Sequence, residues 1–289
     1  MWTTAATYLL ILVGGLVRAS GAGLGCPDWP RCFGSWIPPT SVASLPPEFD
    51  PAQFNARLMW TEYLNRLLGA TVGLLILATA WSAWRHHRHR PRILWPTIAA
   101  VVLVGYEGWL GGRVVAHELA PWIVTAHLIV AIIIVQLLLF ATAEAMAIDA
   151  PASPDADGSG VATAAAGLIG LTLAQAGVGT QVRGLIDDAL DAGVARDAAV
   201  ATVGQFDHWH RNLAFGALLA AAMLTLWLLS RRSPLRHWSF GVLGLAVLQI
   251  AIGMGMAYGA LIPAAQVAHL SVASLLLGAQ TILWLRARR

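Results

Sequence analysis

Eight runs of about 18 or more predominantly apolar residues divide this 289-residue chain, and they constrain its fold more than any other feature. A run of that length crosses the hydrocarbon core of a bilayer as one helix. Hydrophobic residues make up 57% of the chain and charged residues 11%, which excludes an ordinary soluble domain. We therefore predict an all-α integral membrane protein with eight transmembrane helices. The expected helices are 4–18, 63–84, 93–115, 121–143, 161–182, 208–230, 237–258 and 264–285.

The basic residues, all of them arginines, indicate the orientation of these helices. Clusters at 85–92, 231–237 and 286–289 share one side of the membrane if the helices alternate. The positive-inside rule makes that side cytoplasmic, in a multi-pass protein of the cell inner (plasma) membrane. Loops 19–61 and 183–207 are then outside. Arginines at helix ends indicate contact with membrane lipid rather than nucleic acid. The first apolar run lacks a preceding basic segment, so we expect a helix rather than a signal peptide.

The chain repeats itself with a period near 145 residues. Two copies of four helices in the same orientation form a parallel repeat about an axis along the membrane normal. We predict two pseudo-symmetric four-helix bundles, residues 1–147 and 161–289, joined by a polar linker at 148–160. The matching segments are GGLVR (14–18) with GTQVR (179–183), EYLNR (62–66) with DHWHR (207–211), EGWLGG (107–112) with QIAIGM (249–254), and TAHLIVA (125–131) with VAHLSVA (267–273).

Three histidines lie in the outer half of the apolar runs. His127 and His269 occupy equivalent repeat positions, whereas His210 aligns with Asn65. A single histidine there fits an ordinary hydrogen-bonded interior residue, but ionisable groups at membrane depth are rare and usually functional. Two histidines on facing helices of a four-helix bundle can ligate a haem iron, whereas zinc would need further ligands nearby. We therefore predict a bis-histidine haem bound by His210 and His269.

Several arginines lie at the outer helix ends, where the positive-inside rule disfavours them. Arg18 pairs with Arg183 in the repeat, and Arg66 pairs with Arg211. A haem carries two carboxylate propionates, and a guanidinium group binds a carboxylate through a planar fork. We predict Arg18, Arg183 and Arg211 as propionate ligands, with lipid headgroup contact as the alternative.

Two acidic residues stand out in the first half. Glu62 lies three residues before Asn65 and so on the same helix face, where it either complements the helix dipole or takes part in chemistry. Glu107 lies within an apolar run, where an unpaired carboxylate is costly, and it aligns with Gln249. We interpret Glu107 as a hydrogen-bonding group.

Both cysteines of the chain, Cys26 and Cys32, lie in the first outer loop. An outer compartment permits disulfides, so we expect a disulfide between them, with two free thiols as the alternative. The spacing of five intervening residues differs from that of thioredoxin-type redox motifs, which makes a redox-active pair a weak interpretation.

GGLVRASGAGLGCPDWPRCFGSW, TEYLNRLLGA, EGWLGG, AHLIVA, GTQVR and AHLSVA together resemble the haem A synthases of bacteria and mitochondria, over nearly the whole chain. The resemblance implies conversion of the C8 methyl group of haem O to the formyl group of haem A, with molecular oxygen, for terminal cytochrome oxidases. It implies a haem b on His210 and His269 in the second bundle. It also matches Cys26 and Cys32 to the paired cysteines of the family's outer loop.

The same resemblance implies that the first bundle, with outer loop 19–61, is the substrate haem site. Glu62 matches the essential acid of the family and His127 matches an iron ligand, while Arg66 follows the same motif. Many members carry a histidine where this chain has Asn65, and a branch with asparagine there resembles the chain better. The departure argues against a bis-histidine description of the substrate site.

The implied partners are haem O synthase, cytochrome oxidase assembly factors and an electron donor that the sequence does not identify. The sequence leaves a homo-oligomer open. Two other classes stay as alternatives. A non-enzymatic di-haem electron-transfer cytochrome would carry four symmetric histidines, whereas this chain has histidine at three of the four matching repeat positions. A transporter built on a parallel repeat would place its polar groups near the bilayer midplane rather than at the outer end.

Overall fold

The computed structural model describes residues 1–146, 158–196, 198–259 and 261–288. Eight α-helices in these residues are long and apolar enough to cross a membrane, which confirms the predicted fold class. Residues 148–157 of the expected linker lie outside the described residues. Residues 158–160 of that linker belong to a helix. The helices are α1 Trp2–Ala19, α2 Ala56–His87, α3 Pro91–Ala116, α4 Pro121–Met146, α5 Gly158–Asp191, α6 Gln205–Ser230, α7 Arg236–Tyr258 and α8 Pro263–Ala287.

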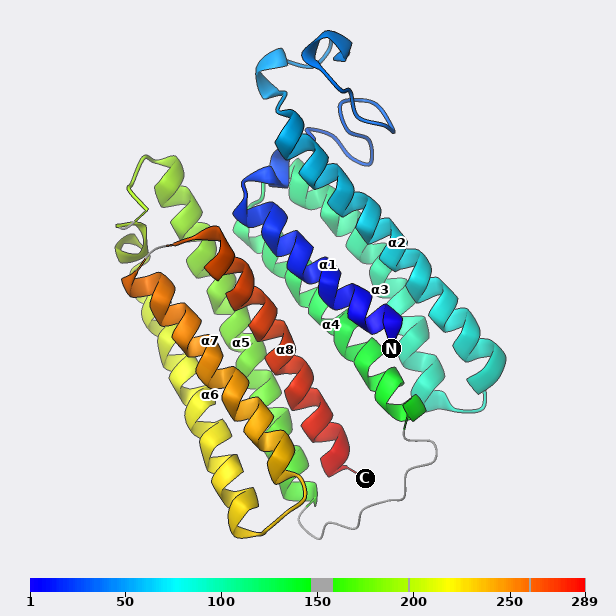
Figure 1. Ribbon diagram of the computed structural model, residues 1–289, viewed down its shortest axis with the longest axis vertical. Coiled ribbons are helices and arrows are strands. Elements are labelled where there is room, and N and C mark those ends of the chain that lie inside the picture. The colour runs from blue at the N-terminus through cyan, green and yellow to red at the C-terminus, as the bar shows by residue number, and fades with distance from the viewer. Residues whose placement is uncertain (147–157, 197, 260, 289) are drawn as a thin grey trace.

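The helices pack as two rings of four (Figure 1). Helix α1 contacts α2 and α4, and α3 packs between α2 and α4. The second ring repeats this order with α5, α6, α7 and α8. The rings meet through α1 with α8, α4 with α5, and α4 with α8. If the halves are exchanged, α1 takes the place of α5 and α4 that of α8. The contact of α1 with α8 then becomes that of α5 with α4, and the contact of α4 with α8 is unchanged. The helix contacts therefore have two-fold pseudo-symmetry.

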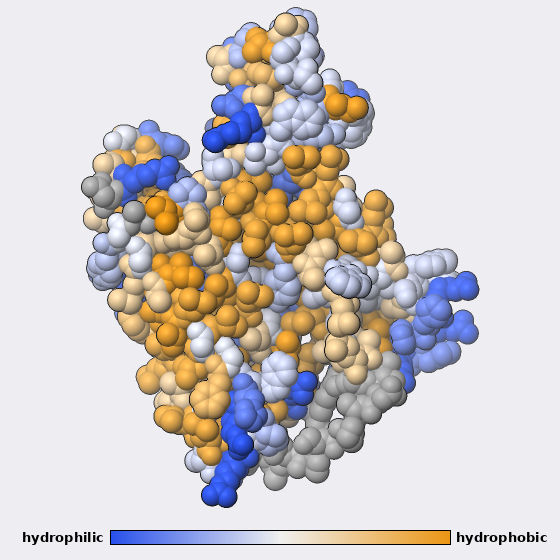
Figure 2. Space-filling view, in the orientation of Figure 1, coloured by the Kyte–Doolittle hydropathy of each residue, from blue (hydrophilic) through white to orange (hydrophobic). Residues whose placement is uncertain are grey.

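Each ring buries its own apolar core and leaves other large apolar side chains exposed. Val72, Ile76 and Leu138 are buried in the first ring. Leu224 and Leu283 are buried in the second. Hydrophobic surface covers the middle of the molecule and hydrophilic residues gather toward its ends (Figure 2). A surface of that kind is stable where lipid, not water, surrounds the helices.

The start of α2 differs from the sequence expectation. The helix begins at Ala56 rather than at 63, because the Asn55 side chain caps it by accepting a hydrogen bond from Leu58 N–H at 3.2 Å. Met59, in this added segment, is fully buried under the outer loop. Glu62 and Asn65 therefore lie in the second and third turns of α2 rather than at its first residues.

The second outer loop, expected over 183–207, is largely helical. Helix α5 continues to Asp191, and a 3-10 turn follows at Ala199–Thr202. An ion pair at helical spacing, Arg183 with Asp187, supports the extension. Its apolar face also buries Ile186 in a small cluster outside the main core. Apolar spacing in this segment was obscured in the sequence by its many acidic residues.

The first outer loop has a small core of its own. Cys26 and Cys32 form the expected disulfide, and both are fully buried together with Phe33. Phe33 packs edge to face on Phe49, with ring centres 5.4 Å apart. In Figure 1 this loop covers the N-terminal end of α2.

Candidate functional site

The second bundle brings His210 of α6 and His269 of α8 together, as the sequence predicted. Their ring centres lie 6.2 Å apart, with an angle of 58° between the ring planes. A bond from imidazole to a transition metal is about 2 Å long, so two rings that share one ion have centres about 6 Å apart. The observed separation therefore fits one metal ion between the two rings.

Glycines on the neighbouring helices make room for both rings. A Cβ atom added to Gly179 of α5 would lie 2.8 Å from His210 Cε1, and one added to Gly253 of α7 would lie 3.1 Å from His269 Cε1. His210 Nδ1 lies 3.2 Å from the carbonyl oxygen of Gln175, which orients the ring with Nε2 free. A side chain at position 179 would displace the His210 ring, and one at position 253 would crowd the His269 ring.

The ligand set fits a haem better than a bare metal ion. Within the described ranges, no group of three or more His, Cys, Asp or Glu side chains converges. A zinc site needs at least three protein ligands, whereas a haem supplies four nitrogens itself and needs only axial ligands. Two facing histidines are therefore sufficient for haem and insufficient for zinc.

The first bundle keeps the same frame with a different ligand set. His127 of α4 occupies the place of His269, and its Nδ1 lies 2.5 Å from Glu107 Oε2 of α3. Its side chain is 43% exposed, so protein does not fill the space beside the ring. Asn65 of α2 takes the place of His210, and its Oδ1 is buried with no hydrogen-bond partner among the described residues. An added Cβ on Gly14, the counterpart of Gly179, would meet nothing within 4 Å.

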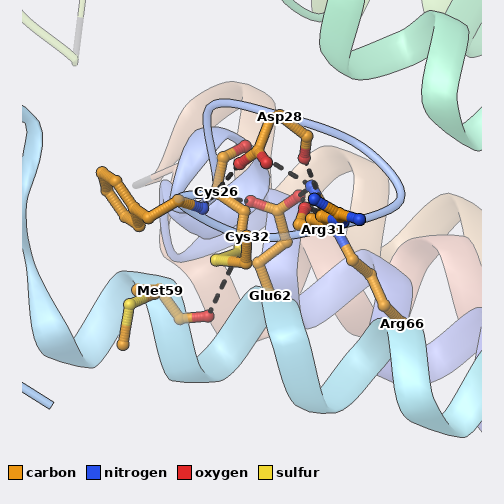
Figure 3. Close-up of polar contacts among 8 residues, drawn as sticks. Cys26, Asp28, Arg31, Cys32, Met59, Glu62 and Arg66 are labelled. Carbon is orange, nitrogen blue, oxygen red and sulfur yellow. Dashed lines mark hydrogen bonds and ion pairs between the residues drawn. A yellow bond between two sulfur atoms is a disulfide. The ribbon is translucent and has the colours of Figure 1, made fainter. Parts of the chain in front are cut away.

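Glu62 lies near the N-terminal end of α2, directly under the disulfide loop (Figure 3). Its side chain is buried, with the residue 4% exposed. Oε2 accepts a hydrogen bond from Cys26 N–H at 2.8 Å, and Oε1 accepts one from Arg66 Nε at 3.1 Å. Arg66 Nη2 also contacts Oε1. The carboxylate is thereby fixed in orientation by one helix and one loop.

Arg66, expected in the substrate site, also holds the outer loop in place. Its Nη1 donates to the carbonyl oxygens of Asp28 at 2.7 Å and Arg31 at 2.8 Å. Asp28 was missed in the sequence: its carboxylate accepts from Phe33 N–H at 2.6 Å and Gly34 N–H at 2.9 Å. An aspartate inside a short cysteine loop is a common turn former, and that signal was present.

The propionate candidates separate into two locations. Arg18 of α1 and Arg183 of α5 meet at the bundle interface, where each binds Asp187, at 3.0 Å and 2.6 Å. Arg18 Nε and Arg183 Nη1 are buried without hydrogen-bond partners in the described parts of the chain. Arg211 lies elsewhere and is engaged by Asp207 at 2.8 Å and the Tyr258 hydroxyl at 2.7 Å. Asp187 was not predicted, although its spacing from Arg183 is that of a helical ion pair.

Comparison with known proteins identifies the family to which this chain belongs. Residues 1–281 match the model of a family described as cytochrome oxidase assembly protein. A relative from Shewanella oneidensis named haem A synthase is 35% identical over 139 residues, 46% of this chain and 40% of the relative. One of the same name from Sphingopyxis alaskensis is 30% identical over 212 residues, 64% of this chain and 58% of the relative. The chain thus matches less than two thirds of the length of these relatives. The match to the family model covers nearly every residue, and the chain belongs to the cytochrome oxidase assembly protein family.

Proposed function

We propose that this protein is a haem A synthase, which oxidises the C8 methyl group of haem O to the formyl group of haem A. The observation that carries the proposal is the unequal ligand set of two otherwise equivalent bundles. The second bundle holds a facing histidine pair, and the first bundle has one histidine and an asparagine at the same positions. The relatives named haem A synthase support it.

The second bundle serves electron transfer in this proposal. His210 and His269 would hold a haem b, which supplies one-electron transfer when it is bound. The close approach of Gly179 and Gly253 restricts movement of the two rings and so keeps both ligands in place. Both imidazoles would be used to hold this haem, so the second bundle would supply electron transfer rather than oxygen chemistry.

The first bundle binds the substrate. His127 holds haem O from one side, and Asn65 is a poor iron ligand, so the other side stays accessible to molecular oxygen. Glu62 gives or takes a proton, because Cys26 N–H and Arg66 leave lone pairs free on a carboxylate that is otherwise fixed. The outer loop covers Glu62 and limits access of bulk water.

Location and partners follow from the same proposal. The arginine-rich segments at 85–92 and 231–237 face the cytoplasm, and both haem sites lie toward the outer face of the inner membrane. Haem O synthase supplies the substrate, and cytochrome oxidase assembly factors receive the product.

The test is haem extraction and chromatography from membranes of cells that make haem O, with and without this protein. We expect haem A only when the protein is present. Glu62→Ala should lower haem A by about 100-fold or more, the usual contribution of a general acid or base, and leave the haem b spectrum intact. Asp207→Ala, at the equivalent repeat position, is the matched control and should keep haem A formation.

Each other outcome has a definite meaning. Normal haem A from Glu62→Ala contradicts the role of Glu62. Loss of haem b in that variant shows that the two bundles are assigned the wrong way round. Haem b without any haem A from the unaltered protein identifies a non-enzymatic electron-transfer cytochrome instead.

A further inference from the structure

The two bundles differ in the residue at one further repeat position, behind the equivalent histidines. In the first bundle, Glu107 of α3 lies with Oε2 at 2.5 Å from His127 Nδ1. In the second bundle, the residue at that position is Gln249 of α7, the counterpart histidine being His269. Glu107 is 8% exposed and Gln249 is 5% exposed, so both lie inside the protein. The first bundle therefore has a carboxylate at a repeat position where the second bundle has a neutral amide.

Glu107 and His127 depend on each other. His127 Nδ1 has no other hydrogen-bond partner among the residues described. Arg66 and Arg113, nearby cations of the same bundle, are engaged elsewhere, with Glu62 and with His117 at 2.7 Å. A buried carboxylate needs a charged or hydrogen-bonding partner to offset its desolvation, and the His127 imidazole is a side chain that supplies one, together with the backbone of Ala131.

The contact determines which nitrogen of His127 can bind a metal. With Nδ1 held by the carboxylate, its proton stays on that side and the lone pair of Nε2 is free. A carboxylate acceptor makes the ring a stronger electron donor than a neutral acceptor does, because a hydrogen bond to an ionised group is about twice as strong. A more strongly donating imidazole would stabilise the oxidised iron.

We propose that Glu107 is a positioning residue that makes His127 a stronger electron-donating iron ligand than His269. The inference rests on the proposed function, because it requires a haem at each histidine. It assigns the low-potential iron to the substrate bundle and the higher-potential iron to the electron-transfer bundle. The difference in potential comes from the residues at one pair of repeat positions, Glu107 in the first bundle and Gln249 in the second. It is separate from the difference between Asn65 and His210. Electron donation by the axial ligand favours oxygen activation over simple electron storage.

A reciprocal exchange tests the proposal. Full-length protein is purified from cells that make haem O, and each haem is titrated with a reductant while its visible spectrum is followed. Glu107→Gln should shift the first-bundle haem toward its reduced form by about tenfold at fixed potential, which is 59 mV for a one-electron couple. The second-bundle haem should not shift. Gln249→Glu should shift the second-bundle haem in the opposite direction, leaving the first unchanged.

Glu144→Gln is the control for loss of a carboxylate. Glu144 lies in α4 at the other end of the same bundle, 3.8 Å from Arg92, and this variant should move neither haem. Glu107→Asp keeps the charge, so the potential of its first-bundle haem should stay close to that of the unaltered protein. A purely structural role for Glu107 predicts lower thermal stability with both potentials unmoved.

The outcomes separate this inference from the proposed function. Absence of bound haem in the unaltered protein overturns the proposed function. Two bound haems whose potentials resist both exchanges overturn the inference alone. If Glu107→Gln loses the first haem, Gln249→Glu decides: a shift of the second haem toward its oxidised form supports the inference, and no shift overturns it.

Discussion

The first and second bundles share a frame and differ in the side chains that face its interior. Both carry an acid–arginine ion pair on the second helix, Glu62 with Arg66 and Asp207 with Arg211. Both also carry a histidine on the fourth helix beside a glycine of the third. The position equivalent to His210 is asparagine in the first bundle. In the proposed function, a repeated four-helix unit acquires a second chemistry by changing one side chain, while the helix packing that positions it is retained.

The equivalent ion pairs also show how the surroundings decide the role of a side chain. Arg66 donates to carbonyl oxygens of the outer loop, so the Glu62 pair fixes a cover over the first bundle. Arg211 donates to the Tyr258 hydroxyl at the end of α7 instead. A helix–loop anchor and a helix–helix contact arise from the same spacing, because only the first half has the disulfide loop.

Making the second bundle resemble the first should have the largest effect, namely loss of the bound haem b. His210→Asn should remove the low-spin haem b spectrum completely, because an amide is a poor iron ligand beside His269. His269→Leu should do the same, whereas His127→Leu should leave this spectrum intact. Visible spectra of the purified variants provide the measurement. Retention of the spectrum by both second-bundle variants would show that these histidines are not the ligands.

The reverse exchange makes the first bundle resemble the second. Asn65→His should keep the fold and should not raise the yield of haem A, because a second imidazole would occupy the position that oxygen needs. Chromatography of extracted haems measures the yield. A yield above that of the unaltered protein would mean that the asparagine is a handicap rather than the basis of the division of labour.

Removing the disulfide, which only the first half possesses, should have an intermediate effect on the stability of its loop. The double change Cys26→Ser and Cys32→Ser should destabilise the outer loop by about 2 kcal/mol, because a short closed loop is released. Cleavage of loop 19–55 by a protease should then be roughly 30-fold faster, while cleavage in 192–204 of the second half stays unchanged. Equal cleavage rates with and without the disulfide would contradict this expectation.

Removing an ion-pair contact between the bundles should have the smallest effect, a slight loss of thermal stability. Asp187→Asn removes the ion-pair partner of Arg18 and Arg183. In the pair with Arg18, the arginine side chain is 22% exposed and the aspartate side chain is 32% exposed. An exposed pair of this kind contributes about 1 kcal/mol or less, so thermal unfolding should shift by only a few degrees. Asp188→Asn, a neighbouring exposed acid, should cause no shift. A loss of either haem would show that Asp187 is part of the site itself.

Sequence reasoning predicted the helices and the repeat, because apolar run length and repeat alignment are local signals. The same alignment singled out His210 and His269, whose ring centres lie 6.2 Å apart. It missed contacts that depend on how distant segments meet. Arg66 was expected in the substrate haem site, yet it also satisfies the carbonyl groups of a loop about 35 residues away in the sequence. Asp187 bridges α1 and α5, and no local pattern states that these helix ends are neighbours. Glu107 was identified as a hydrogen-bonding group, but its partner, His127, required the structure.

Carbon monoxide binding tests the central claim most directly, because the gas needs an open axial position on ferrous haem. The full-length protein, isolated with both haems bound and then reduced, should bind one molecule of carbon monoxide per chain, as measured by the difference spectrum. Asn65→His should abolish this binding without loss of either haem. The account is contradicted if the unaltered protein with two haems binds no carbon monoxide, or if Asn65→His binds it as well as the unaltered protein does.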